Sequence, residues 1–415
     1  MAAIQSTSVR AARVGILQSL VLLGASFVPW KPARELIDSA RSPELNRAER
    51  EQHAAGYYEG LIGGGEGAEG ARGELALRLM GKPSGWVQFS DANVSRLVPD
   101  DFLQFELLPG IRRMLFGKPF VTNSHGMHSA EVSLEKPADT FRIAVLGASM
   151  DMGWGVTYQE TYSHQLQEWL NRHGDRRGLG GRRRFEVLNF AVAAYSPLQR
   201  LESFRRQARA FRPDLVIYSA TLLDRRLTEI HLCEAVRHGA DLTYPFLEEF
   251  LDESGIEHSG HRVEGERLPA LKGQIKEKLA TRYWDLYDRT IGALAGECRA
   301  TGVPLLMVIV PRVGKADAPP ARAEPVAHLK AIADHHAVPL FDLTDTYDRH
   351  DPATLEIAAW DDHPNALGHH RLFLALGRAL SKSEPHYRLL FPEAFATGAS
   401  TATPHETHTD RPPPE

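Results

Sequence analysis

Two short segments contain side chains whose types and spacing could carry out chemistry together. Ser149 follows a glycine and an alanine at the end of an apolar run, and His363 lies two residues after Asp361 in a segment bounded by proline. A carboxylate beside an imidazole fixes its tautomer and stabilises the imidazolium that forms when the ring takes a proton. A serine hydroxyl that loses its proton to such a ring becomes a usable nucleophile. The chemistry predicted for these residues is therefore nucleophilic attack by Ser149.

Both segments also have plainer interpretations. A serine in a turn between a strand and a helix is commonly a cap or turn residue, and the histidine could lie on the surface of a turn that starts a helix. Asp361, His363 and His369 could also bind a metal ion, but no second cluster of ligands is evident in the sequence. We therefore predict neither a metal nor a cofactor.

The elements that must position these residues alternate between strands and helices. Five apolar runs indicate buried strands, at residues 141–147, 185–192, 214–220, 303–311 and 338–343. Helical segments are expected at residues 158–170, 198–211, 275–301, 324–336 and 367–380. Continuous apolar strands that alternate with helices indicate a parallel sheet covered on both faces. Active sites of such sheets form at the carboxyl ends of the strands, which is where Ser149 is expected.

Together the two segments resemble the SGNH, or GDSL-type, hydrolases, and the resemblance covers about residues 141–383. In that family a Gly-Asp-Ser block after the first strand holds the nucleophile, and an Asp-x-x-His block or a close variant near the end holds the acid and base. The matching residues here are Gly147-Ala148-Ser149 and Asp361-Asp362-His363. The runs GWGV (153–156), ETY (160–162) and HPNALGH (363–369) add to the match. The lead-in TNSHGM (122–127) is similar to that of membrane-anchored bacterial members that act near cell-surface polysaccharides.

The resemblance implies a fold and a set of roles. The fold is a flavodoxin-like three-layer α/β/α sandwich with a mostly parallel sheet, preceded by an N-terminal helical and extended appendage. Ser149 is the nucleophile, His363 is the base, and Asp361 orients the base, with Asp362 in reserve. The backbone N–H groups of Ser149 and Ala191 are expected to hold the oxyanion.

The sequence departs from the family's pattern in several places. Ala148 replaces an aspartate that does no direct chemistry, Ala191 stands where the second block has a glycine, and Trp360 stands three residues before the histidine. Leu223 replaces an asparagine that donates to the oxyanion, and losing one such donor typically costs on the order of a hundred- to a thousandfold in turnover. Either another group such as Thr221 substitutes for it, or the activity is low.

Three functions are left open by these residues. The first is a serine esterase that cleaves an O-acyl ester of a carbohydrate or a related substrate. The second is a polysaccharide O-acyltransferase that passes the acyl group to a sugar hydroxyl with the same triad. The third, motivated by Leu223, is a catalytically weak carbohydrate-binding relative. Trp154 and Trp360 flank the nucleophile and the base, and they could stack on a sugar ring or pack in the core.

Composition and charge argue against other classes of protein. The chain has 415 residues, 43% of them hydrophobic, and a net charge of −5, which indicates neither a nucleic-acid-binding protein nor a multi-span membrane protein. Two cysteines provide no disulfide framework. The expected partner is an acylated small molecule or glycan, and no nucleic acid.

The expected domains follow from changes in composition. We predict a signal anchor or signal peptide at residues 1–35, an appendage with a glycine-rich linker at 36–138, the hydrolase-like domain at 139–385, and an extension with a disordered tail at 386–415. The first rests on the uncharged run at 14–30, for which a buried amphipathic helix is the alternative. If this run inserts, the protein is membrane-anchored or exported, and it works in the periplasm or at the cell surface.

Overall fold

The structure is a computed structural model, and it describes residues 89, 92–177, 184–258, 260–265, 267–314, 317–359 and 361–396. All of these belong to one compact unit, Tyr58–Glu415. The expected signal segment, the glycine-rich linker and the tail beyond residue 396 lie outside the described residues.

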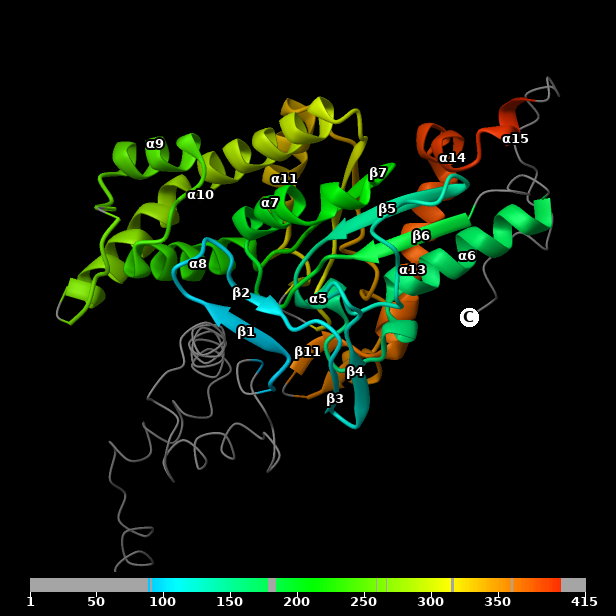
Figure 1. Ribbon diagram of the computed structural model, residues 1–415, viewed down its shortest axis with the longest axis horizontal. Coiled ribbons are helices and arrows are strands. Elements are labelled where there is room, and N and C mark those ends of the chain that lie inside the picture. The colour runs from blue at the N-terminus through cyan, green and yellow to red at the C-terminus, as the bar shows by residue number, and fades with distance from the viewer. Residues whose placement is uncertain are drawn as a thin grey trace, which may run out of the picture. The chain divides into compact units, whose positions relative to one another are not determined.

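A five-stranded parallel sheet forms the centre of the described part (Figure 1). Its strands lie in the order β6-β5-β7-β8-β9. Their bounds are β5 Thr140–Leu146, β6 Arg184–Asn189, β7 Leu215–Ala220, β8 Leu305–Ile309 and β9 Leu340–Asp342. Counted from β5, this is the order 2-1-3-4-5 of flavodoxin-like folds. Each of the five apolar runs overlaps one of these strands, so the parallel α/β sheet predicted from the sequence is confirmed.

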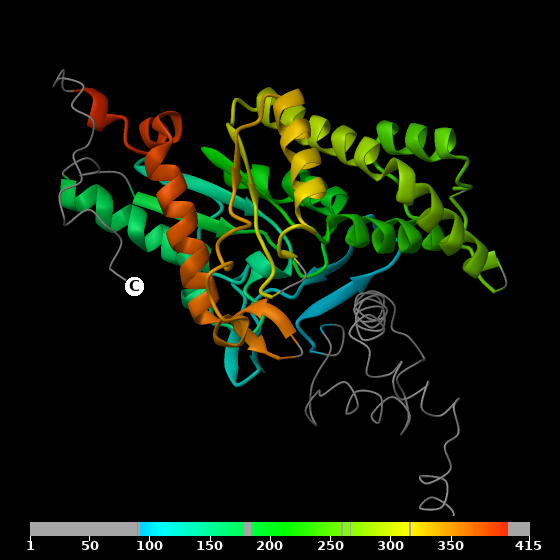
Figure 2. The same ribbon diagram turned by 180° about the vertical axis from the view of Figure 1, so that it is seen from behind.

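Helices cover both faces of this sheet because its strands are apolar on both sides. Successive residues of a strand point to opposite faces, and in β5 Ala144 belongs to one buried cluster and Ile143 to the other. The first cluster is covered by α7 (Pro197–Arg206), α8 (Asp224–His238), α9 (Pro245–Ser254), α10 (Arg267–Ala300) and α11 (Ala323–His335). The second is covered by α6 (Tyr162–Arg177), α13 (Ala366–Lys382) and α14 (Glu384–Leu390). Figure 2 shows α13, in orange, lying over this second face with α6 beside it.

Several shorter elements lie outside the central sheet. Three antiparallel pairs are formed by β1 (Ser95–Val98) with β2 (Gln104–Leu107), β3 (Arg112–Leu115) with β4 (Lys118–Val121), and β10 (Glu356–Ala358) with β11 (Asp361–Pro364). The short helices are α5 (Ser149–Met152), η1 (Tyr158–Glu160), η2 (Ala208–Phe211), α12 (Pro352–Leu355) and α15 (Glu393–Ala396). Of these, α5 and β11 carry the residues that the sequence singled out.

The described residues before β5 pack onto the sheet domain. The Tyr195 hydroxyl donates to the carbonyl of Phe105 at 2.8 Å, and the Gln199 amide donates to the carbonyl of Leu103 at 2.7 Å. The buried guanidinium of Arg142, on β5, donates to the carbonyl of Ser133 at 2.6 Å. Backbone carbonyls of this segment therefore satisfy buried side chains of the sheet domain, and both share one core.

Within the residues that the structure describes, no helix is both long enough and apolar enough to cross a bilayer.

Candidate active site

The carboxyl ends of three adjacent parallel strands bring the expected site residues to one edge of the sheet. Strand β5 leads into Ser149, and β6 leads into the loop that contains Ala191. On the other side of β5, β7 ends at Ala220 and leads into Thr221. This is the edge at which open parallel sheets place their ligands.

A network centred on Asp151 shapes the turn that carries Ser149. The Asp151 carboxylate accepts the N–H of Ala148 at 2.9 Å and the hydroxyl of Tyr162 at 2.7 Å. A Cβ atom built on Gly147 would lie 2.2 Å from Asp151 Oδ2, so only glycine fits there without a shift of the carboxylate. Burial raises the pKa of Asp151 above its ordinary value. Gly147 is therefore required by the close packing of Asp151 against it.

Ser149 itself is the first residue of α5 and is 7% exposed. Among the described residues, neither its hydroxyl nor its backbone N–H has a hydrogen-bond partner. The plainer interpretation, a serine that caps the helix, is not what the structure shows, because the N-cap position is occupied by Ala148.

Asp361 and His363 lie together on the short strand β11, where the sequence indicates a proline-bounded loop. The Nδ1 atom of His363 is 2.5 Å from Asp361 Oδ1, and the same oxygen accepts the His363 backbone N–H at 3.1 Å. With Nδ1 donating its proton to the carboxylate, the neutral ring presents the lone pair of Nε2. This Nε2 atom is buried and has no partner among the described residues.

The two groups of this pair shift each other's pKa in the directions that a base and its orienting carboxylate require. Burial alone would lower the pKa of His363, but the charge and hydrogen bond of Asp361 outweigh it and raise that pKa above 6.5. Burial alone would raise the pKa of Asp361, but His363 outweighs it and lowers that pKa below 3.8. The pair is therefore built to hold a proton on the imidazole beside an ionised carboxylate.

The helix with the serine and the strand with the histidine are neighbours. Residues of α5 have Cα atoms within 8 Å of residues of β11, and Figure 1 draws the two elements side by side. No hydrogen bond joins Ser149 to His363. Catalytic hydrogen bonds are often long or absent until substrate binds, so proximity is the relevant observation here.

The backbone donors near Ser149 differ from those expected. The N–H of Ala191 donates to Asn189 Oδ1 at 3.1 Å, so the expected oxyanion donor is engaged by the side chain two residues earlier. Three residues further on, Ala194 has a φ of 62°, and its N–H has no acceptor among the described residues. The N–H of the intervening Ala193 points at Met152 Sδ, 3.3 Å away on α5, which places this loop against the serine's helix.

Thr221 and Leu223 follow β7, and neither side chain supplies a free donor. The Thr221 hydroxyl donates to Asp224 Oδ1 at 2.9 Å and its N–H donates to Asp224 Oδ2 at 3.1 Å. Asp224 in turn forms a buried ion pair with Arg200, with atoms 2.7 Å apart. Thr221 is therefore committed to a buried structural network, which removes it as the substitute for the missing asparagine.

The tryptophan beside the nucleophile does not present a face to a ligand. Trp154 is 2% exposed, and its ring packs edge-on against Phe89 and Phe116 with centroids 5.6 and 5.4 Å away. It also helps to lower the pKa of Asp361. Sugar stacking by Trp154 is thus replaced by core packing behind the aspartate. Trp360 lies outside the described residues.

Asp362, the alternative carboxylate, and His369, the possible metal ligand, have other partners. Asp362 Oδ2 lies 3.4 Å from the guanidinium of Arg312, which also binds Asp317, and an Asp362 oxygen is within 4.8 Å of ligand atoms of Asp361 and His363. His369 is fully buried, which lowers its pKa to about 3, and its Nδ1 accepts the Tyr162 N–H at 3.4 Å. Its ligand atoms do not join Asp361 and His363 in a cluster among the described residues.

The lead-in TNSHGM forms a turn held together by its asparagine. Asn123 Oδ1 accepts the N–H groups of His125 and Met127, both at 3.0 Å. Gly126 has a φ of 82°, and a Cβ there would lie 3.0 Å from the carbonyl oxygen of Leu107. These contacts give the motif a structural role.

Two cavities in the described part of the chain are not lined by Ser149 or His363. One of them reaches Ala191 and Val192 and is otherwise lined by residues such as His125 and Met127. Ser149 is 7% and His363 3% exposed, so both side chains are buried.

Comparison with known proteins gives structural likeness only. No family model and no curated protein matches the chain. Among solved structures, it is similar to TesA (TM-score 0.37, 13% identity, 59% of this chain and 99% of that one). It is also similar to the acetyl xylan esterase AlAXEase (TM-score 0.35, 10% identity, 58% and 100%) and to the esterase EstA from Pseudoalteromonas sp. (TM-score 0.34, 12% identity, 58% and 99%).

At these TM-scores and sequence identities, the similarity to solved structures says nothing about activity. The strand order is flavodoxin-like, the serine follows the first strand of the sheet, and the aspartate–histidine pair precedes the closing helix. The fold and the order of the site residues are those that the resemblance to the SGNH hydrolases predicted.

Proposed function

We propose that this protein is a serine esterase that cleaves an O-acyl ester through Ser149, His363 and Asp361. The observation that carries the proposal is the buried Nε2 atom of His363, which lacks a partner while Nδ1 is bound to Asp361. A buried ring nitrogen without a partner is costly unless another group uses it. Since α5 adjoins β11, the Ser149 hydroxyl is the group best placed to do so.

The reaction follows from these roles. Ser149 Oγ attacks the ester carbonyl carbon while its proton passes to His363 Nε2, and the carbonyl oxygen becomes an oxyanion. His363 then gives the proton to the leaving alcohol, which departs as the acyl-serine forms. Water next attacks the acyl carbon with His363 again as base, which releases the carboxylic acid and restores the serine hydroxyl.

The backbone N–H groups of Ser149 and Ala194 are the oxyanion donors that we propose. Both lack an acceptor among the described residues, whereas the N–H of Ala191 is bound to Asn189. Ala191 could join them only if this bond were released or shared. Leu223 supplies no donor, so turnover is expected to be low for a hydrolase of this type.

The proposed substrate class is an acylated carbohydrate or a related ester. Support for it comes from the sequence resemblance, in particular the lead-in at residues 122–127, together with the proposed export or membrane attachment through residues 1–35.

A catalytically weak carbohydrate-binding relative is the second candidate, favoured by specific observations. The side chain of Leu223 cannot donate a hydrogen bond, and Thr221 is committed to Asp224. An O-acyltransferase would use the same three residues with a sugar hydroxyl in place of water, and no feature of the described residues distinguishes this acceptor.

The proposal is tested with a fluorophosphonate probe and a short-chain activated ester. We expect the full chain to be labelled and to turn over, and Ser149→Ala to lose both. Ser381→Ala is the matched control, because that hydroxyl donates to the carbonyl of Gly377 on α13, away from the site. Labelling that persists in Ser149→Ala would contradict the proposal. A folded wild type that neither labels nor turns over would favour the weak binding relative.

A further inference from the structure

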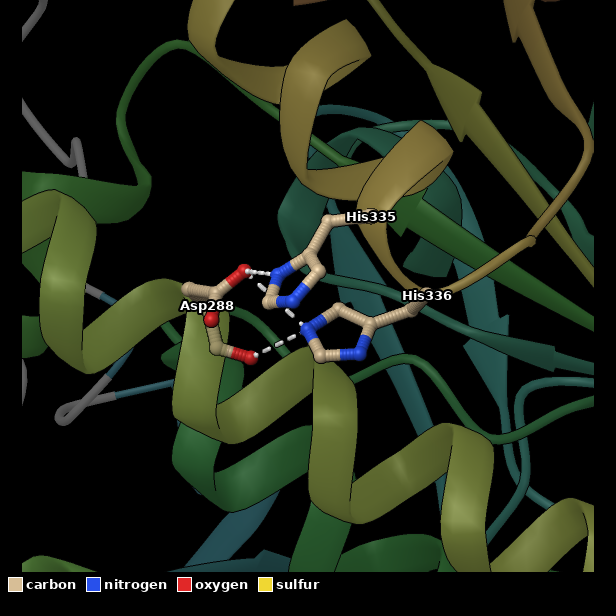
Figure 3. A group of neighbouring side chains, drawn as sticks. All are labelled: Asp288, His335 and His336. Carbon is tan, nitrogen blue, oxygen red and sulfur yellow. Dashed lines mark hydrogen bonds and ion pairs between the residues drawn. The ribbon is translucent and has the colours of Figure 1, made fainter.

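A second group of ligating side chains lies where helices α10 and α11 meet, and it plays no part in ester cleavage. Figure 3 shows Asp288, from α10, facing His335 and His336, from the end of α11. The Nδ1 atom of His335 is 2.8 Å from Asp288 Oδ1, and the Nε2 atom of His336 is 3.0 Å from the same oxygen and 3.0 Å from the backbone carbonyl oxygen of Asp288. One ligand atom from each residue lies within 4.8 Å of the other two. Two imidazoles thus converge on one carboxylate.

The end of α11 makes this convergence possible. Side chains of successive helical residues normally point about 100° apart, so neighbouring histidines rarely face one target. Here His336 is the C-cap, with φ −94° and ψ 4°, and Ala337 follows with a φ of 54°. The helix ends at this point, and the centroids of the two rings lie 4.4 Å apart.

Helix α10 has a glycine at the position where the His336 ring packs against it. Gly292 lies one turn after Asp288, and a Cβ atom there would be 2.7 Å from Cε1 and 3.2 Å from Nε2 of His336. Any other residue would push the ring away from the carboxylate. The glycine therefore leaves the space that the ring occupies beside Asp288.

We propose that Asp288, His335 and His336 form a binding site for a zinc ion. Imidazole nitrogen and carboxylate oxygen are typical zinc ligands, whereas magnesium and calcium prefer sites built from oxygen alone. Three protein ligands leave the fourth tetrahedral position to water. The ion would replace the hydrogen atoms between the rings and the carboxylate, His336 would give up its bond to the Asp288 carbonyl, and each ring would keep its proton on the other nitrogen. Tetrahedral zinc holds its ligand atoms about 3.3 Å apart, so both nitrogens would move outward from the 2.8 and 3.0 Å that separate them from Asp288 Oδ1.

The position of the site indicates a structural ion. Helix α11 ends at His335 and β9 begins at Leu340, so the cluster lies at the amino ends of the parallel strands, opposite the edge that carries Ser149. A zinc ion there would tie α10 to the connection that leads into β9. The side chain of His335 is 66% exposed and that of His336 16%, so the ion can enter from solvent.

The test is calorimetric titration of the full, chelator-treated chain with zinc chloride. Since the chain has further histidines outside the cluster, the variants decide the outcome. We expect one zinc ion per chain to be bound tightly by the wild type and by His328→Gln, the matched control. That histidine lies on α11, stacks on Trp284 and pairs with Glu324. The double variant His335→Gln/His336→Gln and Asp288→Asn should lose this binding.

Gly292→Ala tests the geometry without removing a ligand. It should weaken zinc binding by about tenfold or more, because it displaces a ring that must be oriented. At a zinc concentration a hundredfold above Kd, the wild type should gain roughly 5 °C in Tm, and the double variant should gain nothing. Magnesium should give neither effect. Equal zinc binding by the wild type and the double variant would overturn the proposal, as would equal loss in His328→Gln.

Discussion

The unpartnered Nε2 atom of His363 decides whether Ser149 can act as a nucleophile. The atom is buried, and the other ring nitrogen is held by Asp361 at 2.5 Å. A neutral ring is needed to accept the serine's proton, yet its pKa lies above 6.5. The rate must therefore depend on pH in the range where this imidazole loses its proton.

We predict that kcat/KM for an activated ester falls as the pH falls through the raised pKa of His363. Above that pKa the ring is neutral and the rate reaches a plateau. In Asp361→Asn the interaction that raises the pKa is lost, so the inflection should move to lower pH, and the plateau should fall on the order of 10⁴-fold because the tautomer is no longer fixed. The measurement is kcat/KM against pH for both proteins.

A matched control for this prediction is Asp362→Asn. Its carboxylate pairs with Arg312, and the hydrogen bond between Asp361 and His363 survives the substitution. The charge of Asp362 contributes less than Asp361 to the raised pKa of His363, so the inflection should move to lower pH by less than in Asp361→Asn, and the plateau should stay near that of the wild type. An unchanged inflection in Asp361→Asn would show that the pair does not set the pH dependence.

The second prediction for a single residue concerns the oxyanion donor that Leu223 replaces. Losing one oxyanion donor costs on the order of a hundred- to a thousandfold, so Leu223→Asn should raise kcat by at least about tenfold. Leu223→Ala removes the same side chain without adding a donor, and it should leave kcat low. Equal kcat values for the two variants would mean that position 223 does not face the oxyanion.

Some roles of single residues could be predicted from the sequence and others could not. The pairing of Asp361 with His363 could, because the two residues are close in sequence, but the short strand that carries them could not. The free N–H of Ala194 could not, because nothing in its residue type signals a left-handed conformation, which usually marks a glycine. Thr221 is expected to replace the missing donor or contact the substrate, and Trp154 to stack on a sugar, but burial and their own neighbours use both side chains in the core.

At the scale of elements, the turn between β5 and α5 is the feature on which the nucleophile depends. Asp151 accepts the N–H of Ala148 from within the turn, and Gly147 leaves room for that carboxylate. The four-residue helix α5 is fully buried. The position of Ser149 is therefore fixed by packing on all sides of a short element.

We predict that Gly147→Ala lowers both activity and stability. Its Cβ would lie 2.2 Å from Asp151 Oδ2, so the carboxylate must move and the turn must change. Overpacking of this kind typically costs about 1–3 kcal/mol in the free energy of unfolding, which urea denaturation measures.

The control substitution is Gly273→Ala in helix α10, where a new Cβ meets nothing within 4 Å. It should stabilise the protein by about 0.5–1 kcal/mol, because alanine is the better helix former. A Gly147→Ala variant with wild-type stability and turnover would show that the turn tolerates a side chain.

The strands of the sheet could be predicted because each is a continuous apolar run. The ends of the runs were less well determined. The run at 185–192 continues past the end of β6 at Asn189, since the buried loop after this strand is as apolar as the strand. Helices α8 and α9 were not predicted, although α9 buries Leu247, Phe250, Leu251 and Ser254 at helical spacing between Pro245 and Gly255, a signal that could have found it.

At the scale of the whole molecule, the boundary expected at residue 139 divides a single core. Phe102 and Phe105 precede it, and both are buried. His231, on α8, bonds to the carbonyl of Phe102 at 2.7 Å, and Arg142 bonds to carbonyls of residues 133 and 134. Apolar periodicity could not reveal this, because the contacts join backbone carbonyls of irregular segments to distant side chains.

We predict that a chain starting at residue 139 does not unfold cooperatively, because it leaves these buried groups without partners. A chain that starts at Tyr58, the beginning of the compact unit, should keep a single transition with a Tm close to that of the full chain. Thermal denaturation followed by circular dichroism distinguishes the two. A cooperative transition at the full chain's Tm in the shorter protein would instead support the boundary at 139.

The most direct test of a Ser–His–Asp esterase is to locate the adduct of a fluorophosphonate on the protein by peptide mass spectrometry. We expect the mass of the phosphonyl group on the peptide that contains Ser149, at a rate that falls by orders of magnitude in His363→Ala. An adduct on another serine, or labelling of Ser149 at the same rate without His363, would contradict the proposed mechanism.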